Sequence, residues 1–461
     1  AQKGGRINTD AIDNSAGVDT SDHEVNIKIL LNEMVAAGDM TRKQRDKLLA
    51  EMTDEVGNLV LRDNYLQTEA LSVAQSQAPA LLNQHARFMR ALERSGKLNR
   101  GVEFLPSNTE IARREAAGQG LTRPELAVLL AYAKISLDEE LLPSDLPDDP
   151  QLIDDVIRYF PKALQSSYKA EIGKHRLRRE IISTVVSNSL VNRAGPSFVQ
   201  MMKENTGMTA AAIARAYAIT RGVFDLRDIW GRIEALDTKV PASLQTEMLI
   251  ETTKLAESGT AWFLRNGEHP LDIAANIGAY GPGIKALLAA KGIVSPHDRA
   301  AINERAKAFT DQGAPSDLAE LVATLRYLAP CLDVVRIARG ANIPVEEVGR
   351  TYFAAGDRLG LEWLRQSAAA LAAETHWQRQ AISAVVEDLF AQQRDLASRM
   401  LQHRKANGRI EGPELVGDWL DGRAAVTARL EGLLGELRQS GTVDLAMLTV
   451  ASRELRSLLE R

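Results

Sequence analysis

The sequence predicts a mainly α-helical protein, in which the C-terminal end of an α/β domain is followed by a large all-α region. Apolar residues recur with helical spacing from Val25 onward. Alternating β-branched residues bounded by turn dipeptides are almost absent after residue 30. One short strand is expected over residues 5–12 ("GRINTDAI"), so residues 1–30 are interpreted as the last piece of the α/β domain.

Local signals mark several helix starts in the all-α region. Residues 41–44 ("TRKQ") and 122–125 ("TRPE") each place a threonine three residues before Gln or Glu, which is the spacing of a capping box. Pro124 in the second box and Pro161 in "RYFPKAL" suit the first turn of a helix. Breaks between helical blocks are expected at the turn-rich residues 95–108, 141–151, 266–283 and 403–414.

Composition narrows the possible functions of the chain. The 461 residues are 45% hydrophobic and carry a net charge of −5, which predicts a large core and no electrostatic footprint for nucleic acid or an anionic membrane. There is no run of ~18 apolar residues, so no membrane-spanning helix is expected. The single cysteine, Cys331, lies in an apolar stretch and suits a reducing cytoplasm.

Most motif-like stretches favour a structural interpretation. Residues 281–286 ("GPGIKA") imitate a dinucleotide fingerprint, but no strand precedes them, as that motif requires. Residues 208–224 could form a helix-turn-helix, yet Asp225 and Asp228 follow where phosphates would lie, so a helical hairpin is favoured over DNA binding. The seven histidines show no metal-ligand spacing and no cysteine pair exists, so no metal site and no catalytic constellation are predicted.

The stretch from Ile12 to Ile29 ("IDNSAGVDTSDHEVNIKI") has the character of a binding loop at the start of a helix. Asn14 tolerates unusual backbone angles, and Gly17 lets a ligand approach the main chain. Ser21 or Asp22 is expected to cap the helix that follows, whose first amides would favour a carboxylate or phosphate. The alternative is an ordinary strand-turn-helix corner without a ligand.

The same stretch resembles the signature of the glutamate dehydrogenases, in which an aspartate precedes "NAGGV" and a serine and a glutamate follow it. Two departures, Thr9 and "SAG" in place of "AGG", are similar to the large bacterial NAD-specific members, as are "VNIKILLNEM", "FLPSNTEIARR" and "LTRPELAVLLAYAKISL". The resemblance is specific over residues 4–30 and 104–140 and softer toward the C-terminus. The residues in register with the signature are Asp10, Asn14, Gly17, Val18, Ser21 and Glu24.

The resemblance implies a role for three of these residues. Asn14 would contact the carboxamide of the nicotinamide of NAD. Val18 would form a wall of the pocket for the substrate side chain, and Ser21 would bond the distal carboxylate of L-glutamate. Residues 59–75 resemble the long returning helices that pack the two catalytic domains together.

The resemblance also implies a domain organisation and a reaction. Residues 1–105 would be the C-terminal end of a Rossmann-like α/β catalytic domain, and residues 106–461 a helical C-terminal domain. The parent enzyme would oxidise L-glutamate to 2-oxoglutarate and ammonium with reduction of NAD, in the cytoplasm and as a homo-oligomer, with the helical domain suited to allosteric control. The family's catalytic lysine and aspartate and its glycine-rich phosphate loop would precede Ala1, so these 461 residues alone are expected to be inactive and to depend on the rest of the parent enzyme.

Two other classes of function remain open from the sequence. The chain could be a self-standing helical scaffold or regulatory module, whose opening turn is only a corner. It could also be a helical protein that binds nucleic acid, although its negative net charge argues against this class.

Overall fold

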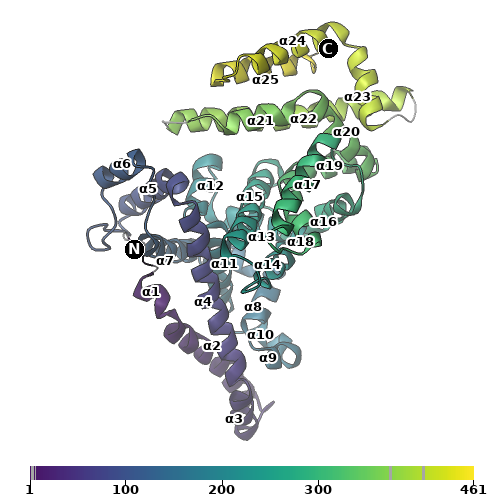
Figure 1. The fold of residues 1–461 in the computed structure, drawn as a ribbon. Helices are drawn as coiled ribbons and strands as arrows, with labels where there is room; N and C mark the ends of the chain where they lie inside the picture. Colours follow the sequence, from purple (N-terminus) through teal and green to yellow (C-terminus); the bar gives the residue numbers. More distant parts are fainter. Residues whose placement is uncertain (2–4, 6, 373–375, 408–410, 461) are drawn as a thin grey trace. The chain divides into compact units, whose positions relative to one another are not determined.

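The computed structural model describes residues 1, 5, 7–372, 376–407 and 411–460, and these residues form helices joined by turns, without a strand (Figure 1). The chain divides into two compact units. Unit 1 comprises residues 1–222 and 226–275, and unit 2 comprises residues 223–225 and 276–461. The boundary expected at residue 105 lies inside unit 1.

Unit 1 is built from fifteen α-helices and two short 3-10 helices within the described residues. They are α1 (Asp10–Asp13), α2 (Ser15–Ala37), α3 (Arg42–Glu51), α4 (Thr53–Ser76), α5 (Ala78–Arg94), α6 (Asn108–Ala116), α7 (Arg123–Leu141), η1 (Leu146–Asp148), η2 (Pro150–Leu152), α8 (Ile153–Tyr159), α9 (Lys162–Ser167), α10 (Lys169–Ile172), α11 (Arg178–Ala194), α12 (Phe198–Thr206), α13 (Ala210–Val223), α14 (Leu226–Glu234) and α15 (Ala242–Asn266).

Unit 2 contains the remaining described helices, and the division between the units falls in the first turn of α16. They are α16 (Ile273–Ala289), α17 (Pro296–Thr310), α18 (Ser316–Thr324), η3 (Leu325–Tyr327), α19 (Leu328–Ala341), α20 (Val345–Arg358), α21 (Leu361–Ala369), α22 (His376–Asn407), α23 (Gly412–Asp421), α24 (Ala424–Gln439) and α25 (Leu445–Ser457).

The helical class predicted for the chain is confirmed, but the strand expected over residues 5–12 is wrong in the part that the structure describes. Residues 7–9 have no regular structure, and Asp10 begins helix α1. A strand is stable only beside another strand that pairs with its backbone. The described residues offer no such neighbour, so a Rossmann-like portion is not seen among them.

The two capping boxes are confirmed, whereas the break expected over residues 266–283 is wrong from Ile273 onward, where α16 begins. The N–H of Gln44 donates to Thr41 Oγ1 at 3.2 Å, and the N–H of Thr41 donates to Gln44 Oε1 at 2.8 Å, which completes the capping box of α3. Glu125 accepts the N–H of Thr122 at 2.7 Å at the start of α7. The "GPG" of residues 281–283 lies inside α16 rather than after a strand, so its rejection as a nucleotide motif is also confirmed.

Helix α4 is central to the part of unit 1 that positions the candidate site. It contacts α2, α7, α11 and α15, and it runs beside α2, to which α3 connects it (Figure 1). Leu31 of α2, Leu71 of α4 and Leu130 of α7 are each at most 1% exposed. Burying a leucine side chain stabilises a fold by roughly 1.5–3 kcal/mol, so these contacts hold α2 firmly in place.

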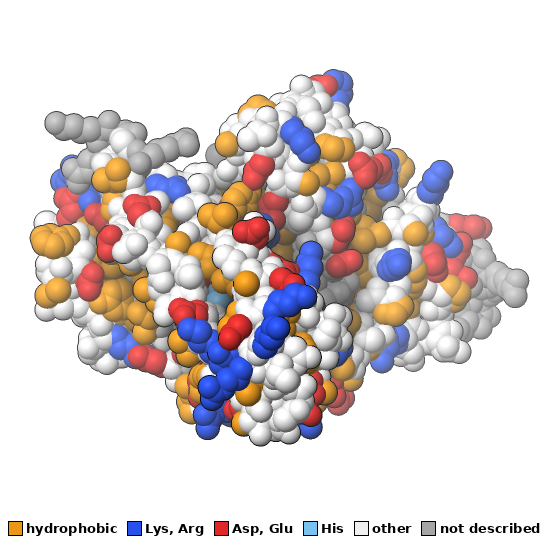
Figure 2. Space-filling view, turned by 90° about the horizontal axis from the view of Figure 1, so that it is seen from below, with side chains coloured by type: hydrophobic (Ala, Val, Ile, Leu, Met, Phe, Trp, Pro, Cys, Tyr) orange, Lys and Arg blue, Asp and Glu red, His pale blue; other side chains and the backbone are white. Residues whose placement is uncertain are grey.

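The surface carries charges of both signs. Figure 2 shows Lys and Arg side chains interspersed with Asp and Glu side chains over one face of the molecule, with hydrophobic side chains scattered between them. Among the described residues, no helix is both long enough and apolar enough to cross a membrane.

Candidate functional site

The residues expected to form a binding loop belong mostly to helix α2. Asn14 separates α1 from α2 with φ −112° and ψ 13°, and its N–H donates to the carbonyl of Asp10 at 2.8 Å. The hydroxyl of Ser15 bonds Asn64 of α4 and accepts a hydrogen bond from Gln67 Nε2 at 3.2 Å. These bonds attach the start of α2 to α4.

The expected cap of the helix at Ser21 or Asp22 is therefore wrong, because both residues lie inside α2. The expected turn around Gly17 is helical as well. Small polar residues favour turns and caps by local hydrogen bonding, which is why the sequence suggested a loop. The burial of His23 and Ile27 on one side of α2 outweighs that local preference.

Of the three predicted site residues, Val18 and Ser21 lie on the exposed face of α2, and Asn14 directly precedes this helix. Asn14, Val18 and Ser21 are separated by four and three residues, the spacing that places side chains on one side of a helix. All three are exposed, and Val18 is 76% exposed. The opposite face, which carries His23 and Leu30, is buried. The structure thus brings the predicted residues together on a surface that points away from the core of unit 1.

Their polar groups are available to a ligand. The hydroxyl of Thr20 donates to the carbonyl of Ala16 at 2.7 Å, whereas the hydroxyl of Ser21 and the side-chain amide of Asn14 have no hydrogen-bond partner among the described residues. An amide both donates and accepts hydrogen bonds, which fits the carboxamide of a nicotinamide. A free hydroxyl can donate to a carboxylate. The face therefore fits the ligands that the resemblance implies.

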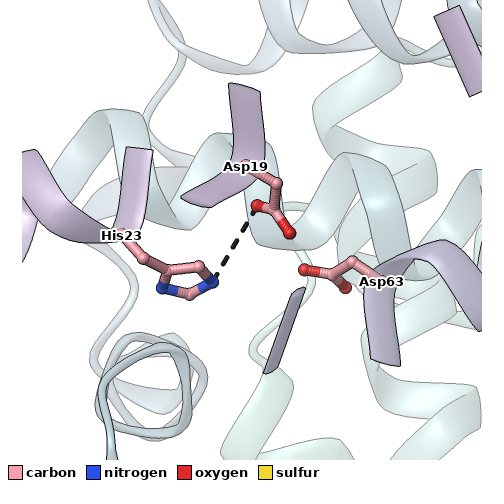
Figure 3. Close-up of side chains that lie close together, drawn as sticks. All are labelled: Asp19, His23 and Asp63. Atoms are coloured by element: carbon pink, nitrogen blue, oxygen red, sulfur yellow. Dashed lines mark ion pairs between the residues drawn. The ribbon is translucent and has the colours of Figure 1, made fainter. Parts of the chain in front are cut away.

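Behind this face, α2 and α4 bring three ionisable side chains together. Asp19 and His23 project from α2 and Asp63 from α4, as Figure 3 shows. His23 Nε2 lies 3.9 Å from Asp19 Oδ1. The ring of His23 stacks on Tyr159 with centroids 4.4 Å apart, and Tyr159 donates its hydroxyl hydrogen to Asp22 at 2.7 Å.

Burial perturbs each group in this cluster. It raises the pKa of Asp19 to about 7, with the charge of Asp63 adding to the effect. It also raises the pKa of Asp63, and the positive charge of Lys134 on α7 opposes this. Burial lowers the pKa of His23 and lowers that of Lys134 to about 8. The cluster therefore combines a neutral imidazole with two carboxyl groups that are both partly buried.

Sequence reasoning missed this cluster. One signal was present, because Asp19 and His23 are four residues apart and hence neighbours on one helix face. Asp63 is distant in the sequence, and only the packing of α4 on α2 brings it near. No spacing rule for metal ligands includes such a residue.

Unit 2 contains a separate cavity of about 530 Å³. The guanidinium of Arg365 lies over Phe390 at 4.4 Å from the ring centroid, and that of Arg438 lies over Trp363 at 5.2 Å. The cavity is thus walled by aromatic rings and by charges of both signs. Its charged lining comprises Arg326, Arg365, Arg438, Asp298, Asp357 and Glu362.

Comparisons with known proteins agree over nearly the whole chain. Residues 1–74 match the family model described as bacterial NAD-glutamate dehydrogenase, catalytic domain, and residues 118–457 match the model described as glutamate dehydrogenase, C-terminal. The chain is 44% identical to the NAD-specific glutamate dehydrogenase of Pseudomonas aeruginosa over 458 residues. It is 38% identical to that of Halomonas elongata and 39% identical to that of Mycobacterium tuberculosis. These matches cover 99%, 100% and 99% of the chain but 28% of each relative.

Proposed function

The chain belongs to the family of bacterial NAD-specific glutamate dehydrogenases, and from that premise we propose that it serves in the oxidative deamination of L-glutamate to 2-oxoglutarate and ammonium. The chain spans 28% of the length of its curated relatives. We therefore propose that it is the C-terminal portion of the enzyme and acts together with the rest of the parent chain. A helical scaffold without catalytic function is not favoured by the family membership.

The exposed face of α2 is the observation that supports this proposal most strongly. In the proposed reaction NAD, when bound, would supply the hydride acceptor for the oxidation of glutamate at its α-carbon. Asn14 would hold the carboxamide of the nicotinamide, and Val18 would exclude water beside the substrate side chain. Ser21 would donate its free hydroxyl hydrogen to the distal carboxylate of glutamate.

The substitution Ser21→Ala tests this assignment in the enzyme at its full natural length. A hydroxyl bonded to a charged group contributes roughly 1.5–3 kcal/mol. Since each ~1.4 kcal/mol is a factor of ten, kcat/KM for glutamate should fall by about 10- to 100-fold. For L-norvaline, which lacks the distal carboxylate, the loss should be much smaller.

Thr20→Ala is the matched control, because the hydroxyl of Thr20 is already bonded within α2. It should leave the preference for glutamate over norvaline unchanged. Equal losses on both substrates for Ser21→Ala would remove Ser21 from the substrate site. A role as helix cap is no longer an explanation, since Ser21 lies inside α2.

We propose that residues 1–105 complete a Rossmann-like catalytic domain and that residues 106–461 form the helical C-terminal domain. The two family models support this division, because they match residues 1–74 and 118–457, on either side of the proposed boundary. Residues 59–75 lie in α4, as expected of a long returning helix.

We also propose that the helical region has an allosteric role, supported by the cavity of about 530 Å³ in unit 2. Its aromatic walls and paired charges suit a small charged effector. Arg438→Ala should weaken any response of the enzyme to such effectors and leave the basal kcat/KM within about twofold. A large loss of basal activity would contradict the proposal.

We further propose a cytoplasmic homo-oligomer. The lone Cys331 is buried and free, which suits a reducing compartment.

Phe104 is 89% exposed and Val102 is 68% exposed in the loop before α6, and such apolar exposure supports a contact between subunits. Light scattering of the Phe104→Ser variant should show a smaller assembly than the wild type, and an unchanged mass would exclude this loop from the contact.

A further inference from the structure

We propose that Asp19, His23 and Asp63 form a binding site for a divalent transition-metal ion of the class of Zn²⁺ or Co²⁺. The site lies in unit 1, on the face of α2 opposite to Asn14, Val18 and Ser21. One imidazole nitrogen and two carboxylate oxygens are ligands that such ions accept. The inference does not depend on the proposed reaction, because it rests on the packing of α2 against α4.

The geometry brings the ligand atoms close to the required separation. One ligand atom from each of the three side chains lies within 4.8 Å of the others. In a tetrahedral site, metal–ligand distances of about 2.0–2.2 Å place two ligand atoms about 3.3–3.6 Å apart. Side-chain rotations that move the ligand atoms by about 1 Å are therefore needed to complete the site.

His23 is the observation that separates this cluster from an ordinary group of acidic residues. Its side chain is 2% exposed, and neither ring nitrogen has a hydrogen-bond partner in the structure. A buried polar group without a partner is uncommon and costly. Its Nε2 faces Asp19, as Figure 3 shows, and the stack on Tyr159 fixes the ring in that orientation. A metal ion bound at Nε2 would satisfy the nitrogen that now faces the carboxylates.

The side chains of Asp19 and Asp63 hydrogen-bond to each other, so the two carboxyl groups share a proton. Asp19 Oδ2 is buried without a hydrogen-bond partner. Asp63 lies next to Asp19, so two acidic groups share one partly buried space. Lys134 supplies one positive charge nearby, and Asp22 adds a further negative one. A divalent cation would take the place of the proton that the two carboxyl groups share, and it would offset the repulsion between the two ionised carboxylates.

The chain contains its own matched control for the histidine. His85 on α5 is also buried, at 0% exposed, and neither of its ring nitrogens has a hydrogen-bond partner. Burial alone lowers its pKa to about 4, and no charged group contributes. His85 thus has the same burial as His23 without the carboxylates, so His85→Gln removes a buried imidazole but no ligand.

Binding of Co²⁺ by the metal-free protein at its full natural length tests the proposal. Visible absorption and calorimetry should show about one ion bound per chain, with the absorption of Co²⁺ in a nitrogen and oxygen environment. His23→Gln and Asp63→Asn should each weaken binding by at least ~10-fold, since each removes a ligand. His85→Gln should bind as the wild type does. Absence of binding by the wild type, or an equal loss in His85→Gln, would overturn the proposal.

A second measurement needs no variant and so does not depend on how the substituted proteins fold. Crystals of the wild-type protein grown with Co²⁺ should show an anomalous difference peak between α2 and α4, within bonding distance of His23 Nε2. Peaks only at other places, or no peak, would contradict the site.

Discussion

Asp155 is a buried carboxylate that three arginines share. It is 2% exposed, and Arg221 Nη2 lies 2.8 Å from its Oδ2, while Arg158 and Arg227 bond its Oδ1. Burial alone would raise the pKa of Asp155, but Arg221, Arg227 and Arg158 reverse this and hold the pKa well below its usual range. The charge of Asp155 is thus favourable only as part of this group.

The substitution Asp155→Asn should therefore destabilise unit 1. Removing one partner of a buried ion pair leaves uncompensated charge and typically costs ~3–5 kcal/mol. The free energy of unfolding, measured by urea denaturation, should fall by that amount. Asp154→Asn is the control, because the neighbouring Asp154 is half exposed and pairs with Lys169 only at 3.7 Å; its loss should cost at most ~1 kcal/mol. Similar effects of the two substitutions would contradict this account.

Asp155 should also cause part of the pH dependence of the free energy of unfolding. Because the pKa of Asp155 is lower in the folded chain than its unfolded value of about 3.9, its contribution is complete above that value. The contribution is lost as the pH falls below about 3.9 toward the folded pKa. The stability difference between wild type and Asp155→Asn should therefore shrink in that acid range and stay constant between about pH 5 and 7. A difference that grows on acidification would contradict the assignment.

At the scale of single elements, substitution of two glycines by alanine should change the free energy of unfolding in opposite directions. Gly57 is exposed inside α4, and a Cβ built on it meets nothing within 4 Å. A Cβ on Gly120, before α7, would lie 2.2 Å from the carbonyl carbon of Ala78. Gly57→Ala should raise the free energy of unfolding by ~0.5–1 kcal/mol, because glycine is a poor helix former. Gly120→Ala should lower it by ~1–3 kcal/mol through the clash.

Thermal and urea unfolding of both variants check this pair of predictions. If Gly120→Ala were as stable as the wild type, the close approach of the chain at Ala78 would be incorrect. If Gly57→Ala were destabilised, α4 would not be an exposed regular helix at that position.

The elements were predictable from the sequence to the extent that their signals are local. The box of Thr41 and Gln44 marked the start of α3 correctly, because a cap depends on residues three positions apart. The cap of this helix was expected at Ser21 or Asp22, whereas α2 begins at Ser15, because the bonds between Ser15 and α4 connect residues far apart in the sequence. The strand expected over residues 5–12 was wrong for a related reason in the described part of that range, since a strand depends on a neighbour that no local pattern supplies.

At the scale of the whole molecule, the predicted site residues could be placed on one face only once α2 was known to be a continuous helix. The family signature identified these residues in the sequence. Their common exposure could be recognised only from the structure, in which the opposite face of α2 is buried. The cluster of Asp19, His23 and Asp63 could not be predicted from the sequence. Asp63 lies near the other two residues only because α4 packs against α2. The helical class followed from periodicity along the chain, whereas the division into two compact units depends on long-range packing that periodicity does not encode.

The central claim is that the exposed face of α2 lines the site for NAD and glutamate. The native Cys331 is buried, and burial raises the pKa of its thiol to about 12, so within these 461 residues an introduced cysteine is labelled selectively, and the label is followed at that position. The test is the rate at which a maleimide labels Val18→Cys in the enzyme at its full natural length, with and without NAD and 2-oxoglutarate. Lys47→Cys on α3, 77% exposed, is the control.

With both ligands at roughly 100 times their Kd the site is free only about 1% of the time, so labelling of Val18→Cys should slow by ~10-fold or more. Labelling of Lys47→Cys should not change. Residual activity of Val18→Cys establishes that this variant still binds its ligands. Equal labelling rates of an active Val18→Cys enzyme with and without ligands would contradict the claim that this face of α2 lines the active site.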